Sequence, residues 1–267
     1  MKPSGIGGQA VIEGIMMRNK DMYSVAVRKP DGEIEVHLGT YQSIVKSKMI
    51  REIPLVRGVI NFIDSMILGM RTLTFSASFY EEEEEPTKAE VVLDKVTKGN
   101  SEKILTGLTV AFSIVMAVAI FMILPYFLTN FLRDYVVSNT LLAIIEGVVR
   151  VGVFLLYILL ISRMNDIQRV FMYHGAEHKC INCIEHGMEL NVENVMKSSK
   201  HHKRCGTSFL FIVMFVSIIF FIFIRVTSPV LRVVIRLLLI PVIAGVSYEL
   251  IKFAGNSDSK FVQIISY

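Results

Sequence analysis

Long apolar segments dominate the chain after residue 103. Four of them contain few charged positions, and they cover residues 104–132, 140–161, 208–226 and 230–253. A hydrocarbon core about 30 Å thick needs roughly 20 apolar residues per helix, so each segment is close to the length of a membrane crossing. Helices satisfy the backbone hydrogen bonds that lipid cannot. The pattern predicts an α-helical integral membrane protein with about four transmembrane helices, which has the lipid bilayer as a partner.

Alternation with a period of two precedes these segments. Apolar residues occupy positions 23, 25 and 27 and positions 34, 36 and 38, on either side of Pro30-Asp31-Gly32. This pattern predicts a β-hairpin. Because an isolated hairpin is marginally stable in water, we expect it to pair with residues 10–12 or to rest on the loop domain described below. The predicted fold class therefore adds a small α+β cytoplasmic domain, containing an N-terminal β-hairpin, to the transmembrane helices.

Residues 53–80 are apolar but are interrupted by Arg57, Asp64 and Arg71. A spacing of seven keeps these three side chains near one face of a helix. We expect an amphipathic helix that lies either at the membrane surface or against the protein's own domain. The acidic run that follows at residues 81–85 indicates a solvated linker.

These patterns divide the chain into successive segments. In order they are a Gly-rich cytoplasmic segment with the hairpin (1–52), an interfacial helix (53–80), an acidic linker (81–103), two transmembrane helices (104–162), a cytoplasmic loop (163–207), two further transmembrane helices (208–253) and a cytoplasmic tail (254–267).

Charge sets the expected orientation. The net charge of +4 is too small to indicate nucleic-acid binding. Lys and Arg residues concentrate before the first apolar segment and in the loop at 163–207. By the positive-inside rule, that loop and both termini are expected to be cytoplasmic. The N-terminus lacks the basic start and apolar core of a cleavable signal, so we expect the first long apolar segment to direct insertion.

A few charged residues fall inside the apolar segments. Glu146 and Arg150 are four positions apart in one of them, and Glu249 lies in the last. A charge at membrane depth costs about 2.5–3.5 kcal/mol on insertion scales. Glu146 and Arg150 are therefore expected either to form an intrahelical pair or to line a polar cavity that opens toward the cytoplasmic loop.

The cytoplasmic loop gathers the metal-binding residue types, with five of the six histidines and all three cysteines. If the H-x-x-E-H pattern is helical, His174 and His178 share one face and two imidazoles can bind one metal ion. Glu177 then lies where a carboxylate can act as general base. The third ligand in this interpretation is Glu185, Glu193, His202 or Cys205.

Two other interpretations stay open. Cys180, Cys183, His202 and Cys205 have spacings that suit a structural Cys₃His zinc site. Alternatively, the histidines form ordinary hydrogen bonds and hold no metal, because short motif matches also arise without a site.

Several longer motifs point to a known family. They are GGQAVIEGIMMR (7–18), PLVRG (54–58), EGVVR (146–150), RVFMYHGAEHK (169–179), RCGTSF (204–209) and GVSYELI (245–251). Together they resemble the YqhQ-type family of bacterial membrane proteins of unknown function, which is described as predicted metal-dependent enzymes without an assigned reaction. The resemblance implies functional positions at His174, Glu177, His178, Glu193, His202, Arg204 and Cys205. Cys180 and Cys183 are not part of the family pattern.

The motif at residues 7–18 has two interpretations. Gly7, Gly8 and Gly14 are expected to form tight turns that lead into a strand. Alternatively, they let backbone approach a ligand closely, with Glu13 and Arg18 as participants.

Two functions from different classes follow. The first is a zinc-dependent hydrolase at the cytoplasmic membrane surface, with Glu177 as general base and Arg150 or Arg204 stabilising negative charge. Its substrate would be a peptide or a lipid-linked molecule. The second is a non-catalytic factor for membrane-protein insertion or quality control beside the Sec translocon or the ribosome. The charged face of residues 53–80 and the Glu146–Arg150 pair favour the second.

Overall fold

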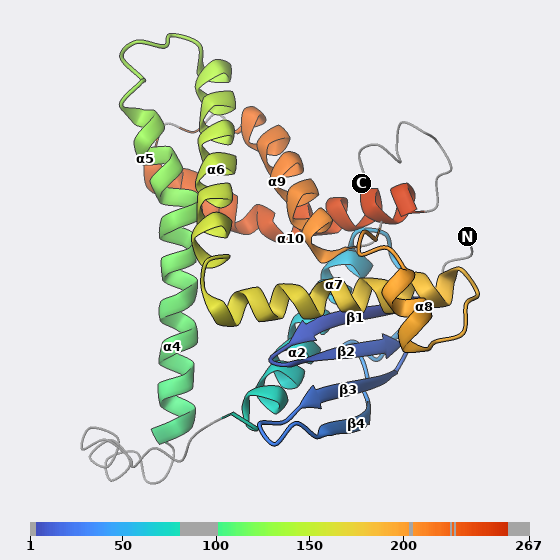
Figure 1. Cartoon of the computed structure of the whole chain (residues 1–267). Coiled ribbons are helices and arrows are strands. Elements are labelled where there is room, and N and C mark those ends of the chain that lie inside the picture. Colours follow the sequence, from blue (N-terminus) through green and yellow to red (C-terminus); the bar gives the residue numbers. More distant parts are fainter. Residues whose placement is uncertain (1–3, 81–100, 203–204, 225, 227, 256–267) are drawn as a thin grey trace. The chain divides into compact units, whose positions relative to one another are not determined.

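The computed structural model describes residues 4–80, 101–202, 205–224, 226 and 228–255 (Figure 1). They fall into two compact units. The sheet unit comprises residues 1–80, 160–220 and 235–267, and the helical unit comprises residues 81–159 and 221–234.

A four-stranded antiparallel sheet forms the N-terminal part of the sheet unit. Its strands follow in chain order, β1 (Ile6–Val11), β2 (Gly14–Asn19), β3 (Met22–Arg28) and β4 (Ile34–Thr40). The predicted hairpin is present as β3 and β4, with Val25 opposite His37. Residues 10–12 do not pair with this hairpin as a neighbouring strand, because β1 pairs with β2, which then pairs with β3. Val11 nevertheless shares a buried core with Val25 and Val27 of the hairpin.

The glycines of the opening motif lie in strands rather than in turns. Gly7 and Gly8 belong to β1, and Gly14 begins β2. The turn between the two strands contains Glu13 in a left-handed conformation, with φ of 49°. The period-two pattern is hidden here, because glycine contributes no side chain to it.

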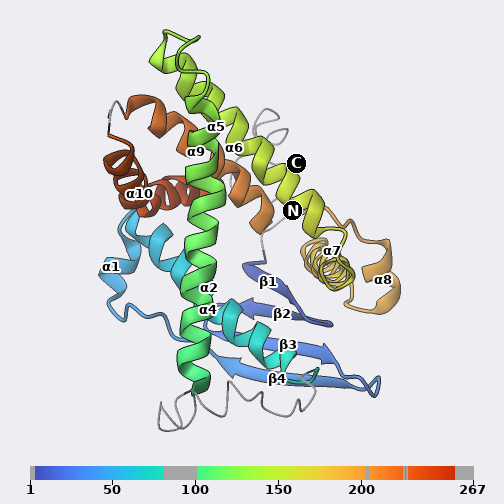
Figure 2. The same cartoon turned by 90° about the vertical axis from the view of Figure 1, so that its left-hand side faces the viewer.

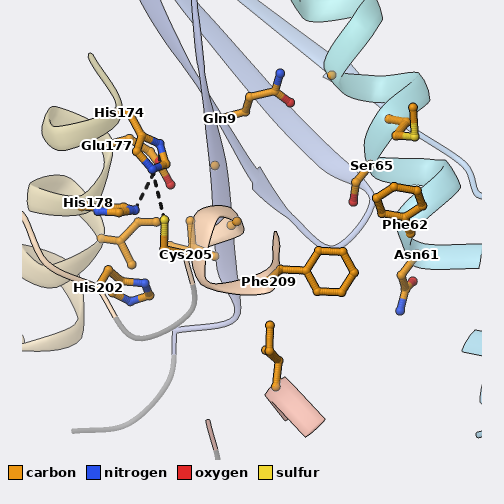
Figure 3. A pocket seen from close by; sticks show the side chains of 18 of the residues that line it. Gln9, Asn61, Phe62, Ser65, His174, Glu177, His178, His202, Cys205 and Phe209 are labelled. Carbon is orange, nitrogen blue, oxygen red and sulfur yellow. Dashed lines mark hydrogen bonds and ion pairs between the residues drawn. The ribbon is translucent and has the colours of Figure 1, made fainter. Parts of the chain in front are cut away.

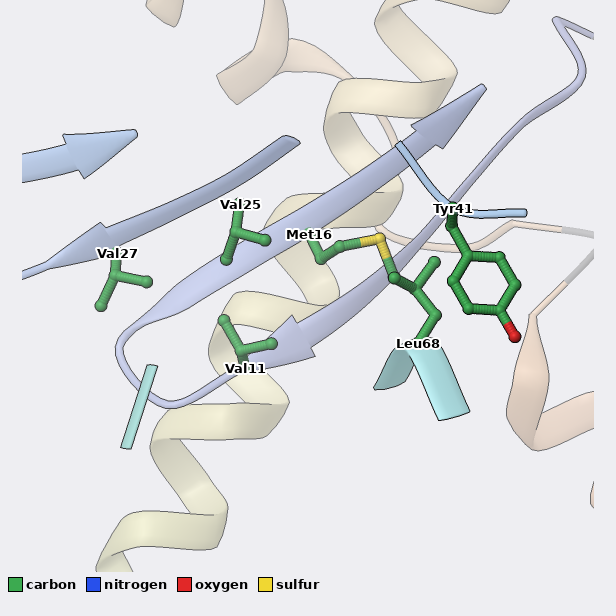
Figure 4. Packing of buried hydrophobic residues seen from close by; sticks show 6 residues of the cluster. All are labelled: Val11, Met16, Val25, Val27, Tyr41 and Leu68. Atoms are coloured by element: carbon green, nitrogen blue, oxygen red, sulfur yellow. The ribbon is translucent and has the colours of Figure 1, made fainter. Parts of the chain in front are cut away.

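Helix α2 (Val56–Ala77) packs on the sheet (Figure 2), and the short α1 (Lys48–Glu52) precedes it. The core between α2 and the sheet is apolar, and Figure 4 shows its buried members. They are Val11, Met16, Val25, Val27, Tyr41 and Leu68. Residues 25 and 27 alternate along β3 and so face the same side of the sheet.

The charged positions of α2 are engaged within the protein. Asp64 is buried and accepts hydrogen bonds from the Tyr41 hydroxyl and the Ile44 backbone, both at 3.1 Å. The Arg71 guanidinium lies 5.8 Å from the centre of the Tyr41 ring. This face of α2 therefore rests against the protein's own sheet.

Three helices are long and apolar enough to cross a membrane, at Ile104–Asn130, Asn139–Ile161 and Val230–Phe253. The first runs through α4 (Ser101–Val118), a π-helical turn η1 (Ala119–Ile123) and α5 (Leu124–Asn130). The second is α6 (Asn139–Ile161), and the third lies within α10 (Pro229–Gly255). The third predicted segment, 208–226, contains a shorter apolar helix, Ser208–Phe223, within α9 (Gly206–Phe223). These helices indicate a membrane protein.

The helical unit holds a buried polar pair. Glu146 and Arg150 of α6 form an ion pair at 3.1 Å, and both side chains are buried. Arg150 also donates from Nε to the carbonyl oxygen of Phe121, at 3.2 Å. Phe121 lies in η1, where the wider π-helical turn changes the backbone hydrogen-bond pattern. The Arg150 side chain thus joins α6 to the π-helical turn.

Candidate metal centre

The H-x-x-E-H motif lies on α7 (Asn165–Glu185), so the predicted loop is largely helical. Asp166 in the first turn of α7 interacts favourably with the helix dipole. Gly187, with φ of +71°, allows the chain to leave the helix. The short α8 (Val192–Lys197) follows. The Asn191 side chain caps its N-terminus by accepting a hydrogen bond from the Asn194 backbone nitrogen, at 2.9 Å.

Three donor side chains converge beside α7. The ligand atoms of His174, His178 and Cys205 all lie within 4.8 Å of one another (Figure 3). The Nε2 atom of His174 is 3.1 Å from the Cys205 sulfur. Cys205 immediately precedes α9 and comes 31 positions after His174 in the chain. Helical spacing brings the two histidines together, and the return of the chain to α7 adds the cysteine.

The second nitrogen of each histidine ring lies close to an oxygen atom. Nδ1 of His178 lies 2.8 Å from the carbonyl oxygen of Lys200. A carbonyl oxygen can only accept, so Nδ1 carries the hydrogen and Nε2 of the neutral ring keeps its lone pair. Nδ1 of His174 lies 3.2 Å from Oε2 of Glu177. A backbone carbonyl such as that of Lys200 typically orients a metal-binding histidine.

Glu177 supplies a buried negative charge at the cluster. Glu177 is 3% exposed, and its Oε2 atom has no hydrogen-bond partner among the described residues. The two imidazoles lie on either side, with His174 Nδ1 at 3.2 Å and His178 Nε2 at 4.0 Å. Burying a carboxylate oxygen without a hydrogen bond is costly, so a nearby cation would stabilise this arrangement.

The electrostatics of the cluster favour a positive charge. The Cys205 thiol, and then the Glu177 carboxylate, raise the pKa of His174 to about 10. The Cys205 thiol also raises the pKa of His178, against the opposing effect of burial. Either a proton or a metal ion can provide the positive charge that these neighbours stabilise.

The donor set fits a metal ion. Donor atoms around a tetrahedral zinc ion lie about 3.3–3.8 Å apart, given metal–ligand bonds of about 2.0–2.3 Å, and the three atoms here lie within 4.8 Å of one another. Two imidazoles and a thiol are nitrogen and sulfur donors, which transition metals prefer over Mg²⁺ or Ca²⁺. The cluster of His174, His178 and Cys205 could therefore hold a metal ion.

The other candidates for the third ligand contact other partners, although the centre of the His202 ring lies 5.8 Å from that of the His178 ring. His202 Nε2 lies 3.4 Å from Oε2 of Glu185. Glu185 also accepts from the backbone nitrogen and the hydroxyl of Ser4, both at 2.9 Å. Glu193 is exposed on α8 and pairs with Lys197 at 2.6 Å. Of the four residues considered for this role, the structure brings Cys205 to the histidines.

Several further sequence candidates lie apart from the cluster. Glu249 of α10 pairs with Arg57 of α2, with Nε 2.6 Å from Oε1. The Cys183 thiol is fully buried and lies 3.4 Å from the carbonyl oxygen of Glu189. Cys180 is half-buried on α7, and the described metal group includes neither of these cysteines. Arg204 lies outside the described residues.

Sequence reasoning missed how the β1–β2 turn contacts α7. Glu13 accepts from Nε of Arg169 at 2.6 Å and from the Tyr173 hydroxyl at 3.1 Å. The hydrogen bond from Arg169 lowers the pKa of Glu13. These contacts hold α7 beside the sheet, and ligand binding by Glu13 stays a prediction. The motif that contains Glu13 was the available signal, whereas nothing in the sequence marks the Lys200 carbonyl as a histidine partner.

Comparison with known proteins agrees with the family resemblance. The profile of the family described as "Protein of unknown function (DUF1385)" matches residues 53–267, which include the whole cluster. The chain is similar to "Uncharacterized protein YqhQ" of Bacillus subtilis (strain 168), with 34% identity over 268 residues. That match covers 99% of this chain and 84% of the relative. No solved structure matches. The chain belongs to the DUF1385 family of proteins of unknown function.

Proposed function

We propose that this protein is a membrane-embedded, metal-dependent hydrolase whose metal ligands are His174, His178 and Cys205. The observation that carries the proposal is the buried Oε2 atom of Glu177, which lacks a hydrogen-bond partner among the described residues beside these three donors. A buried carboxylate in this position suits a general base. Three protein ligands also suit a catalytic site, because a fourth position is then left for water or substrate.

Each residue has a distinct task in this proposal. Zinc is the ion that the donor set suits, and when bound it would polarise a substrate oxygen and increase the acidity of water. Glu177 accepts a proton from the attacking water at Oε2 and returns it to the leaving group. The Lys200 carbonyl fixes the His178 ring. Low exposure of Glu177 removes competing solvent and strengthens its charge interactions.

We further propose a topology with four crossings, in which Ser208–Phe223 is the shortest membrane helix. An even number of crossings puts both termini on one side. The concentration of Lys and Arg at residues 163–207 supports a cytoplasmic position for that side and for the metal cluster.

A conservative substitution tests the catalytic role of Glu177. Glu177→Gln should keep the bound metal, because Glu177 is not one of the three ligands, and should lower hydrolysis by about 10²–10⁴-fold, the usual range for a general base. Metal content and ester or amide hydrolysis would be measured on the same preparation. Unchanged hydrolysis in Glu177→Gln, or no hydrolysis by metal-loaded wild type across ester and amide substrates, would exclude this mechanism.

A second function is supported by a different surface. Ile34, Val36 and Leu38 are exposed on β4, the last strand of the described sheet. An apolar edge strand is a typical site for a protein partner. This surface supports a non-catalytic factor that docks on the Sec translocon or the ribosome. Photocrosslinking from position 36 tests it, and recovery of neither partner in cells would count against it. The charged residues of α2 that first suggested this function contact other parts of the chain instead.

A further inference from the structure

A cavity of about 870 Å³ adjoins the metal cluster in the sheet unit. Its lining includes the three donors, Glu177, and residues of β1, α2, α9 and α10. This volume lies within the range of about 300–1,000 Å³ that is typical of small-molecule sites. Figure 3 shows the cluster on one side and Phe62, Ser65 and Asn61 of α2 on the other.

The cavity wall away from the cluster is mainly apolar. Phe62, Met66, Met70 and Leu73 follow each other along one face of α2. Met66 and Met70 are each 55% exposed, although both are apolar. Unbranched methionine side chains adapt to flexible apolar ligands. This wall therefore suits a hydrocarbon chain.

Two other elements continue this wall toward the membrane helices. Phe209 lies near the start of the apolar helix Ser208–Phe223, and Ile251 lies near the end of the membrane-length helix Val230–Phe253. The cavity thus shares its lining with helices whose composition suits lipid. A ligand from the bilayer could keep its hydrocarbon part in apolar surroundings as it entered.

The size of the cavity argues against a transmembrane helix as the ligand. An α-helix about 10 Å across occupies roughly 800 Å³ in about 10 Å of length, or about seven residues. A helical substrate would therefore have to unwind or remain largely outside. A single flexible hydrocarbon chain fits the same volume without any unwinding.

The polar residues of the cavity lining indicate which polar head group the ligand carries. None of its described lining residues is Lys or Arg, so among them a positive charge can be carried only by the histidines of the cluster. Neutral polar groups are present, among them the Gln9 side chain. Gly69 allows Gln9 to lie against α2, because a Cβ at position 69 would come within 2.4 Å of Gln9 Oε1. A carbonyl compound matches this lining, because its oxygen can lie at the cluster while the neutral remainder of its head group meets groups such as Gln9.

We propose that the cavity binds a neutral carboxylic ester with one long acyl chain, drawn from the bilayer, with its ester group at the cluster. This inference rests on the proposed hydrolase. Water adds to the acyl carbonyl carbon, and the bond from that carbon to the alcohol oxygen breaks. The proton taken up by Glu177 passes to the departing oxygen, so that the ester and water become a fatty acid and an alcohol.

Photolabelling tests binding separately from hydrolysis. The probe is a palmitoyl monoester with a diazirine in its chain, added to full-length Glu177→Gln protein in phosphatidylcholine nanodiscs. We expect labelled peptides from α2 and α9. Met70→Trp, which fills the cavity from an exposed position, should reduce this labelling about tenfold or more. Ile63→Trp is the matched control, because Ile63 is 38% exposed on the same helix and does not line the cavity. Equal labelling of the two variants would overturn the proposal, as would displacement of the probe by an apolar peptide but not by palmitate.

Hydrolysis assays with an intact Glu177 distinguish failure of the acyl-binding site from failure of the proposed hydrolase. Wild type should prefer the palmitoyl ester to the acetyl ester, and Met70→Trp should remove this preference. Hydrolysis of both esters at rates that Met70→Trp does not change would overturn the acyl site and leave the hydrolase standing. Labelling that Met70→Trp blocks, without hydrolysis of either ester, would support the binding site and overturn the hydrolase. Cleavage of a phosphodiester in preference to the carboxylic ester would overturn the assigned head chemistry.

Discussion

Nδ1 of His178 donates a hydrogen bond to the backbone carbonyl of Lys200, at 2.8 Å. This contact turns Nε2 of the ring toward His174 and Cys205, which supply the other donor atoms of the cluster. The carbonyl belongs to the segment that leads from α8 to Cys205. The same piece of backbone therefore orients one ligand and delivers another.

Asn182 holds that segment in place. Its Nδ2 atom donates to the carbonyl oxygens of Ser199 and His201, at 2.7 and 2.9 Å. We predict that Asn182→Ala weakens metal binding about 10–100-fold, the usual effect of losing a contact that orients a ligand. Titration with a competing chelator measures the change. Asn194→Ala is the control, because Asn194 donates to the Glu189 carbonyl, outside this segment. Equal affinities in the two variants would contradict the role given to Asn182.

Gly8 of β1 faces the Glu177 carboxylate. A Cβ at position 8 would lie 2.6 Å from Glu177 Oε1, closer than atoms can approach. Gly8→Ala should therefore displace the carboxylate and lower hydrolysis by about 10²-fold, as misplacing a catalytic group by about 1 Å can do. Metal content should change little. Gly7→Ala is a matched control, since a Cβ there meets nothing within 4 Å. A loss of activity in Gly7→Ala as large as that in Gly8→Ala would rule out this explanation.

The Glu13–Arg169 contact should make stability depend on pH. Its hydrogen bond lowers the pKa of Glu13 below the ordinary value of 4.5. The contact therefore stabilises the folded protein above pH 4.5 and ceases to do so as the pH falls through the lowered value. Wild type should unfold at a higher temperature than Glu13→Gln at pH 6, and this difference should shrink toward pH 3.

Thermal unfolding at several pH values provides the test. Glu35→Gln removes one carboxylate from exposed β4 and serves as the control for a general effect of charge. A difference between wild type and Glu13→Gln that stays constant from pH 6 to pH 3 would show that the ion pair does not contribute.

Leu68 tests the packing of α2 on the sheet. This side chain is 1% exposed and contacts the core of the sheet. Leu68→Ala should destabilise the sheet unit by about 2–5 kcal/mol, through lost burial and the cavity left behind. Met66→Ala, at an exposed position on the same helix, should have a much smaller effect. Thermal unfolding of both variants would be compared, and similar midpoints would contradict the packing of α2 on the sheet.

The parts of the fold that the sequence predicts are those with a local pattern of apolar residues, either alternating or in long runs. Alternation at positions 23–27 and 34–38 identified the β3–β4 hairpin. Long apolar runs identified the three membrane-length helices. The extent of strands β1 and β2 was not predicted, because Gly7 and Gly8 lie within β1 and Gly14 begins β2. A strand formed through tertiary pairing leaves little signal where side chains are absent.

The candidate site was only partly predictable for a related reason. His174 and His178 could be paired because a helix brings together residues four positions apart. Cys205 could not be chosen over Glu185, Glu193 or His202, since no local spacing rule joins residues 31 positions apart. Glu185 and His202 instead contact each other, at 3.4 Å. The identity of the third ligand depends on how the chain returns from α8 to the two histidines of α7.

The most direct test of this account is the metal content of the purified full-length protein, measured by elemental analysis. Wild type should contain about one zinc ion per chain, because three donor atoms converge at a single position. His174→Ala together with His178→Ala should lose the ion, and Cys205→Ser should bind it more weakly. Cys180→Ser should retain it, since the cluster does not include this residue. Folded wild type that takes up no stoichiometric metal, even when zinc is supplied, would contradict the central claim.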